Sequence, residues 1–235
     1  MSKHSKWATT KRWKAVVDAR RGNAFTKLGR DITVAVRTGG ADLESNFKLR
    51  LAIERARDAS MPKDNIDRAV KKGTGEMDGE KVEEILYEGF GPNGIALVIE
   101  TITDNRNRTV NELKHLLVKI GGSLGTTGST IRLFDRLGVF QCGRLLTDEE
   151  TLLVIDAGAK DIEETDDGLM VSTASESFQK VKELLVRLNV TIKGADLRYV
   201  PKETVAVENT ESIEKLLEEL EGLDDVQNVY CNAEI

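Results

Sequence analysis

The sequence of 235 residues is poor in the residue types on which many secreted proteins and metalloenzymes depend. It contains two cysteines and three prolines. Cys142 and Cys231 are too few for a disulfide framework or a four-ligand zinc site, and each lies in an apolar, strand-like run. We expect two reduced thiols with a structural role. With 40% hydrophobic and 31% charged residues, the composition is that of a globular protein, not of a disordered chain.

Long apolar runs are also absent. The longest one, GIALVI at 94–99, is far too short to cross a bilayer. The start, MSKHSKW, lacks the apolar core of a signal peptide. We therefore expect a cytoplasmic protein without a membrane partner.

The sequence offers little to catalysis. His4 and His115 are the only histidines, and His115 lies in the amphipathic pattern NELKHLLVKI. The glycine-rich stretch GGSLGTTGST at 121–130 has no lysine after its last glycine, which a P-loop requires. It also follows a predicted helix and precedes a predicted strand, which is the reverse of a dinucleotide-binding turn, so a helix C-cap and a loop are predicted there. No catalytic residue, metal ligand or cofactor is predicted. The enzyme hypothesis is an unrecognised carboxylate-only site, or an enzyme that acts through a cleft near TDNRNRT (103–109).

Charge is distributed unevenly along the chain. Residues 1–75 hold 18 lysines and arginines against 8 aspartates and glutamates, a net +10, and the remaining residues hold 16 against 32, a net −16. Such asymmetry indicates a basic module that meets a polyanion and an acidic body that does not. The alternative is a pair of well-solvated helical surfaces.

The basic part is predicted to be helical, because its apolar residues recur at spacings of three and four. The predicted helices are SKWATTKRWKAVVDARR (5–21), AFTKLGRDITVAVR (24–37), NFKLRLAIERARDA (46–59) and SMPKDNIDRAVKKG (60–73). Asn23 is predicted as the N-cap of the second helix, and Gly39 and Gly40 as its end. Pro62 is placed in the first turn of the last helix and Gly73 at its stop.

The first of these helices belongs to an N-terminal arm, residues 1–21, that holds both tryptophans. Trp13 continues an apolar stripe and is predicted to be a core residue. Trp7 instead shares its face with Lys11 and Lys14. Its ring could stack on a base or dock onto the body of the protein.

The acidic body contains an internal repeat. From Ile131, the patterns predict strand, helix, two strands, helix and strand, which is the ferredoxin-like order. On either side lie halves of a second such unit: strand 94–103 and helix 107–121 upstream, and strand TVAVEN (204–209), helix 211–222 and strand 226–235 downstream. We predict an α+β fold with an N-terminal helical bundle followed by two ferredoxin-like α/β sandwich domains, one inserted in the other. The predicted domains are 1–75, 82–130 plus 203–235, and 131–202, with a linker at 73–81.

Two stretches of the acidic body bear on nucleic-acid binding. Gly89-Phe90-Gly91 echoes part of an RNA-recognition motif, but Glu88 stands where that motif needs Lys or Arg, and a turn at Pro92–Gly94 explains the stretch better. In TDNRNRT (103–109), Arg106 and Arg108 lie at a predicted helix start, where backbone N–H groups favour an anion. Helix capping, with the arginines paired to acidic neighbours, is an equal alternative.

Several stretches together resemble the YebC/PmpR family. They are HSKWATTKRWK, FTKLGRDITVAVR, MPKDNIDRAVKKGTG, YEGFGPNGIALVIETITDNRNRT and GGSLGTTGSTIRLFDRLG, in this order along the chain. The chain departs from the family pattern at Lys3, where glycine is usual, and at Trp13, where a basic or polar residue is common. The resemblance implies an N-terminal helical domain and two ferredoxin-like domains, in agreement with the patterns.

For function, the resemblance implies a non-enzymatic regulator of gene expression. Bacterial members are described as probable transcriptional regulators that bind DNA. A mitochondrial relative is similar to a translational activator of cytochrome c oxidase, and bacterial relatives have been connected with ribosomes stalled at proline-rich stretches. The predicted partner is therefore nucleic acid, either duplex DNA or the ribosomal RNA of a ribosome. The predicted nucleic-acid-binding residues are Lys3, His4, Ser5, Lys6, Trp7, Lys11, Arg12, Lys14, Arg20, Arg21, Lys27, Arg30, Arg106 and Arg108.

Overall fold

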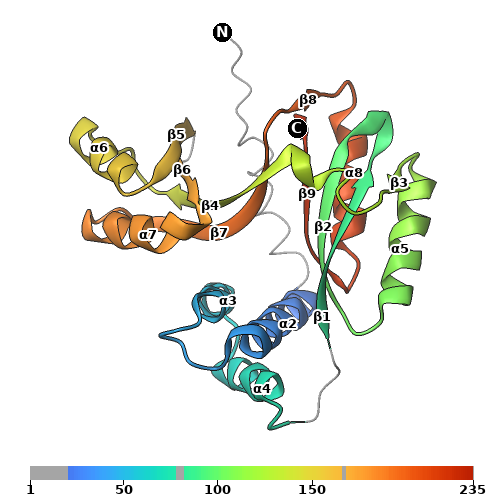
Figure 1. The fold of residues 1–235 in the computed structure, drawn as a ribbon, viewed down its shortest axis with the longest axis horizontal. Helices are drawn as coiled ribbons and strands as arrows, with labels where there is room; N and C mark the ends of the chain where they lie inside the picture. The colour runs from blue at the N-terminus through green and yellow to red at the C-terminus, as the bar shows by residue number, and fades with distance from the viewer. Residues whose placement is uncertain (1–20, 78–81, 166–167, 235) are drawn as a thin grey trace. The chain divides into compact units, whose positions relative to one another are not determined.

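A computed structural model describes residues 21–77, 82–165 and 168–234 of the chain. They form two compact units (Figure 1). One comprises the described residues up to Ile131 together with the C-terminal segment from Thr204, and the other is Arg132–Glu203. The division into three domains with the limits given above stays a prediction.

The first unit begins with three helices around a small apolar core. They are α2 (Arg21–Gly39), α3 (Phe47–Asp58) and α4 (Lys63–Thr74). The predicted stripe of α2 faces this core: Ile32 and Val36 are buried, and Phe25 and Leu28 pack against the cluster. Burying a side chain such as Ile32 stabilises the fold by roughly 1.5–3 kcal/mol relative to leaving it exposed.

Asparagine 46 joins α2 to α3, as the N-cap of the second of these helices. The Asn46 side chain accepts a hydrogen bond from the Leu49 N–H and donates to the carbonyls of Ala35 and Gly40. The predicted cap at Asn23 was wrong, because α2 already begins at Arg21 and Asn23 lies inside it. No proline stands directly before Asn23 that would prevent the helix from starting earlier. An asparagine inside a helix lowers its stability by less than about 1 kcal/mol, so the helix can include Asn23.

The predicted stop of α4 at Gly73 was also wrong. Gly73 lies inside the helix, and the C-cap is Gly75, with a left-handed φ of 81°. The glycine at position 73 serves packing instead: a Cβ there would lie 2.5 Å from the Cβ of Val36 on α2. Pro62 stands one residue before α4, at its N-cap and not in its first turn.

The remainder of the first unit is a four-stranded antiparallel sheet in the order β3-β1-β2-β9. Helices α5 and α8 pack on one face of it through a buried apolar cluster (Figure 1). The elements are β1 (Glu83–Phe90), β2 (Ala96–Thr103), α5 (Arg106–Lys119), β3 (Ser123–Leu124), β8 (Val205–Ala206), α8 (Thr210–Glu221), β9 (Val226–Cys231) and β10 (Ala233–Glu234), with a 3-10 turn at Pro92–Gly94.

The second unit forms a sheet in the order β5-β6-β4-β7, again antiparallel throughout. Phe140 of β4 and Phe178 of α7 stack in its core with ring centroids 4.5 Å apart. The elements are β4 (Phe134–Cys142), α6 (Asp148–Asp156), β5 (Ala159–Thr165), β6 (Gly168–Ala174), α7 (Phe178–Arg187) and β7 (Ile192–Pro201), with 3-10 turns at Ile131–Leu133 and Ser175–Ser177. The predicted ferredoxin-like order is confirmed here.

Both sheets have the same spatial strand order when β2, β3, β1 and β9 of the first sheet are matched to β4, β5, β6 and β7 of the second. In this match β1 occupies the place of the third strand of the ferredoxin-like order. The expected third strand, TVAVEN, was wrong: only Val205–Ala206 is extended, and it pairs in parallel with β10 outside the four-stranded sheet. The strand β1 occupies the third-strand position, between β3 and β2, because it precedes β2 along the chain and reaches it through the tight turn at Pro92–Gly94. The turn itself was predicted; the strand before it was not.

Both cysteines are buried in strands, and neither is in a disulfide. Burial raises the pKa of the Cys142 thiol to about 11, so the thiol stays protonated and unreactive at neutral pH. Among the described helices, none combines the length and the apolar composition that crossing a membrane requires.

Candidate nucleic-acid interface

The predicted binding residues of the N-terminal arm lie outside the described residues. They are Lys3, His4, Ser5, Lys6, Trp7, Lys11, Arg12, Lys14 and Arg20. The backbone of Arg21 begins α2. The core position predicted for Trp13 is likewise outside the described range. Four predicted residues can therefore be located by their contacts: Lys27, Arg30, Arg106 and Arg108.

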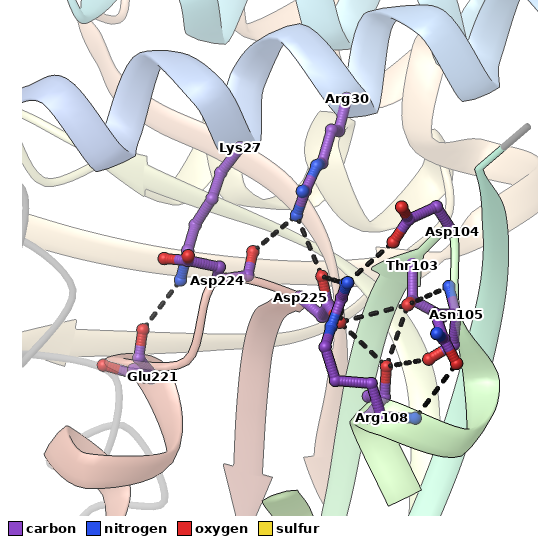
Figure 2. Close-up of polar contacts among 10 residues, drawn as sticks. Lys27, Arg30, Thr103, Asp104, Asn105, Arg108, Glu221, Asp224 and Asp225 are labelled. Carbon is purple, nitrogen blue, oxygen red and sulfur yellow. Dashed lines mark hydrogen bonds and ion pairs between the residues drawn. The ribbon is translucent and has the colours of Figure 1, made fainter. Parts of the chain in front are cut away.

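Lys27 and Arg30 project from α2 toward an acidic turn, residues 221–225, between α8 and β9 (Figure 2). The Lys27 Nζ donates to the carbonyl oxygen of Glu221 at 2.7 Å. One Arg30 amino group donates to the carbonyl oxygen of Asp224 at 2.8 Å and to Asp225 Oδ1 at 3.2 Å. These two cations join the helical part of the first unit to its sheet.

Asp225 is the centre of this network. Its side chain is 2% exposed, and it accepts hydrogen bonds from Arg108 at 2.8 and 2.9 Å. The hydroxyls of Thr103 and Thr109 donate to its Oδ2 at 3.0 and 2.8 Å. Burial raises the pKa of Asp225, but the hydrogen bonds from Arg108 and the threonines outweigh it and hold that pKa below its usual value. The carboxylate is therefore charged, and its neighbours are satisfied.

Arg106 and Arg108 follow the second of the two alternatives left open by the sequence. Asn105 is the N-cap of α5, and its side chain accepts from the Arg108 N–H. The Arg108 guanidinium pairs with Asp104 as well as Asp225. Arg106 forms a fork with the Glu83 carboxylate, which is an exposed pair at the edge of the sheet. The start of α5 is thus occupied by capping and ion pairs, and a role for these arginines in binding nucleic acid stays a prediction.

The glycine-rich loop that looks like a phosphate cradle in sequence holds an anion of the protein itself. The buried Glu88 carboxylate accepts hydrogen bonds from the backbone N–H groups of Gly128, Thr130 and Ile131 at 2.6–2.7 Å. Burial raises the pKa of Glu88, but the backbone hydrogen bonds together lower it by more than burial raises it, so the net shift is downward. Donors of the kind that bind phosphate in other loops are used here to fix the loop to β1.

A second group of cations, on α3 and α4, is not among the predicted binding residues. These side chains are exposed, and none makes a hydrogen bond or ion pair with a described residue: Arg57, Lys63, Arg68, Lys71 and Lys72. Other cations of the same helices are engaged, since Lys48 pairs with Glu84 and Arg50 donates to the Glu44 carbonyl. The helical spacing of the charges could have revealed the group, because its members lie away from the apolar stripes.

No group of three or more histidine, cysteine, aspartate or glutamate side chains within the described ranges is arranged to hold a metal ion. Exposed lysine and arginine groups of the described residues can attract an anion, and the buried carboxylates of Glu88 and Asp225 already have donors.

Comparison with known proteins gives full-length matches. Residues 5–76 match the family model described as the TACO1/YebC protein N-terminal domain, and residues 82–233 match the model of the TACO1/YebC second and third domain. A probable transcriptional regulatory protein of Thermoanaerobacter pseudethanolicus is 45% identical over 240 residues, covering 100% of this chain and 98% of the relative. Another, of Pelotomaculum thermopropionicum, is 47% identical, covering 100% and 99%. The crystal structure of a conserved hypothetical protein from Aquifex aeolicus matches with a TM-score of 0.86 and 44% identity over 98% of this chain and 97% of that one.

Proposed function

The chain belongs to the TACO1/YebC family, and from this premise we propose that it regulates gene expression by binding nucleic acid, with duplex DNA as the ligand. The relatives named probable transcriptional regulatory proteins support the regulatory part of the proposal. The chain acts without catalysis in this proposal, as a binding protein.

One observation carries the nucleic-acid part. The first 75 residues have a net charge of +10 in a protein whose remaining residues have a net charge of −16. A surface of lysine and arginine attracts the phosphate backbone and releases its counterions, which supplies most of non-specific affinity. The acidic body repels the same polymer, so the ligand is directed to the N-terminal part.

The proposal is tested by charge reversal in the arm. Changing Lys6, Lys11, Arg12 and Lys14 to glutamate removes candidate phosphate contacts, and each lost contact lowers the log–log salt slope of binding by about 0.7–0.9. The measurement is affinity for duplex DNA at several salt concentrations. The matched control changes four exposed cations of the acidic part to glutamate: Lys114, Lys160, Arg187 and Lys215. An unchanged slope in the arm variant, or equal slopes in the two variants, would contradict binding through the arm.

A second candidate function is binding of ribosomal RNA by a ribosome-associated translation factor. Trp7 favours it, because the helix predicted for residues 5–21 would place its ring on one face with Lys11 and Lys14, where it could stack on an unpaired base. Trp7→Ala should then weaken binding to ribosomes by about 1–3 kcal/mol and leave binding to duplex DNA nearly unchanged, since duplex bases stay stacked. Trp13→Ala is the control: Trp13 is predicted to be a core residue, and loss of a core tryptophan lowers thermal stability whichever polymer is bound. Equal losses on both polymers would refute base stacking.

A further inference from the structure

The exposed cations of α4 are concentrated on one part of its surface. Ile66 and Ala69 are buried against the core of the helical part. At 3.6 residues per turn, Arg68 and Lys71 fall on the side away from these two residues, and Lys72 lies beside Arg68, all between the middle and the last turn of the helix. Three positive charges therefore share one outward-facing surface.

The helix that carries these charges is firmly seated. Gly73 lets the backbone of α4 approach Val36 of α2 more closely than any side chain would allow. The Thr33 hydroxyl on α2 donates to the Ala69 carbonyl at 3.1 Å. Because α4 is fixed in this way, its outer face is a preformed surface, and the long side chains alone need to adjust to a ligand.

Local stabilisation of the helix does not account for all three charges. Lys71 and Lys72 lie in the last turn, where cations interact favourably with the helix dipole. Arg68 lies before the last turn, so this effect does not reach it. Asp64 and Asp67 stand four residues before Arg68 and Lys71, a spacing that permits ion pairs, but the structure contains neither pair among its described residues.

We propose that the outer face of α4, formed by Arg68, Lys71 and Lys72, contacts the phosphate backbone of the nucleic acid. This inference rests on the proposed function and specifies a surface for it outside the N-terminal arm. Arg68 at the centre can bind a phosphate oxygen pair with its planar fork, and the two lysines supply point charges on either side. The contact is to the backbone and carries no sequence preference.

The test is the salt dependence of binding by a triple variant, Arg68→Gln, Lys71→Gln and Lys72→Gln. If all three groups contact a duplex, the log–log slope falls by about 2.7, and the affinity lost between about 50 and about 200 mM salt shrinks by about 40-fold. Probes are a duplex DNA and a duplex RNA of equal length and mixed sequence. A reduction on both duplexes supports the shared backbone contact, and a reduction on one identifies the polymer that α4 meets.

Two further variants make the result specific. Arg68→Lys, Lys71→Arg and Lys72→Arg together keep the charge and should keep the slope. Lys114→Gln, Lys160→Gln and Arg187→Gln remove the same charge from exposed positions of the acidic part and should also leave the slope as in the wild type. Thermal unfolding of each variant establishes that it is folded.

The outcomes separate this inference from the proposed function. A folded α4 variant with the wild-type slope, beside an arm variant with a reduced slope, would overturn the contact at α4 and leave the proposed function intact. Equal reductions in the α4 variant and in the control variant would also overturn it, because net charge alone would then explain the change. A wild-type protein that binds neither duplex DNA, duplex RNA nor ribosomes would overturn both proposals.

Discussion

The cations of α2 and α5 and those of α4 look alike in the sequence and differ entirely in their surroundings. Arg30 and Arg108 converge on Asp225, a carboxylate whose side chain is 2% exposed. Arg68 and Lys71 have no such partner among the described residues. The difference lies in the acidic turn, which comes almost 200 positions later in the chain than Arg30. A positive charge is therefore available to a ligand only where the fold has not brought a buried carboxylate to it.

The largest expected effect concerns the carboxylate that distinguishes the two groups. Asp225→Ala should lower the free energy of unfolding by about 3 kcal/mol, the low end for removal of one member of a buried ion pair. The value is at the low end because Arg108 is 42% exposed and can turn to solvent. Chemical denaturation measures the loss. Asp67→Ala on α4 is the matched control and should change stability by less than about 0.5 kcal/mol. Similar losses in both variants would erase the contrast between the two regions.

The contrast also shows how far sequence patterns reach. Apolar spacing predicted the three described helices of the N-terminal part and the order of elements in the second unit, because burial imposes the period of each element. It missed β1 as a member of the first sheet, since the pairing of β1 with β2 and β3 is decided by the tertiary fold.

The same limit applies to the candidate site. The sequence places Arg30 and Arg108 among cations available to a phosphate, yet a buried carboxylate distant in the chain pairs with both. Local pattern carries no information on such long-range pairs. Conversely, the exposed face of α4 could be predicted from helical spacing, because Arg68 lies on the opposite side of the helix from Ile66.

A second prediction separates the effect of burial from the effect of an arginine partner. Glu88 is buried like Asp225, but its donors are backbone N–H groups and the Thr130 hydroxyl. Glu88→Gln replaces one acceptor oxygen by an NH2 group that cannot accept, and should cost about 2 kcal/mol, since a buried donor is left unsatisfied. Glu84→Gln, in an exposed pair with Lys48, is the control and should cost about 1 kcal/mol or less.

The Glu88 effect should also depend on pH with a definite sign. The pKa of Glu88 is lower in the folded protein, so its carboxylate contributes stability that is fully present above the unfolded pKa of about 4.3. That contribution is lost as pH falls through the folded pKa. The difference in unfolding free energy between wild type and Glu88→Gln should therefore be constant from pH 7 to about pH 5 and shrink below about pH 4. A difference that grows with acid would show that the sign of the shift is wrong.

The smallest expected effect belongs to Arg106, whose surroundings are intermediate between the two regions. It has a carboxylate partner, Glu83, but the side chains are 65% and 42% exposed. An exposed pair contributes about 0.2–1 kcal/mol, so Arg106→Gln should change the free energy of unfolding by less than about 1 kcal/mol. A double-mutant cycle with Glu83→Gln isolates the pair energy.

Because water already reaches this pair, a phosphate could replace Glu83 as the partner of Arg106 at little cost, whereas Arg108 would have to leave a buried carboxylate. Arg106→Gln should consequently lower the salt slope of nucleic-acid binding more than Arg108→Gln if the start of α5 contacts the ligand. Wild-type slopes in both variants would restrict the phosphate contacts to the arm and the helical part.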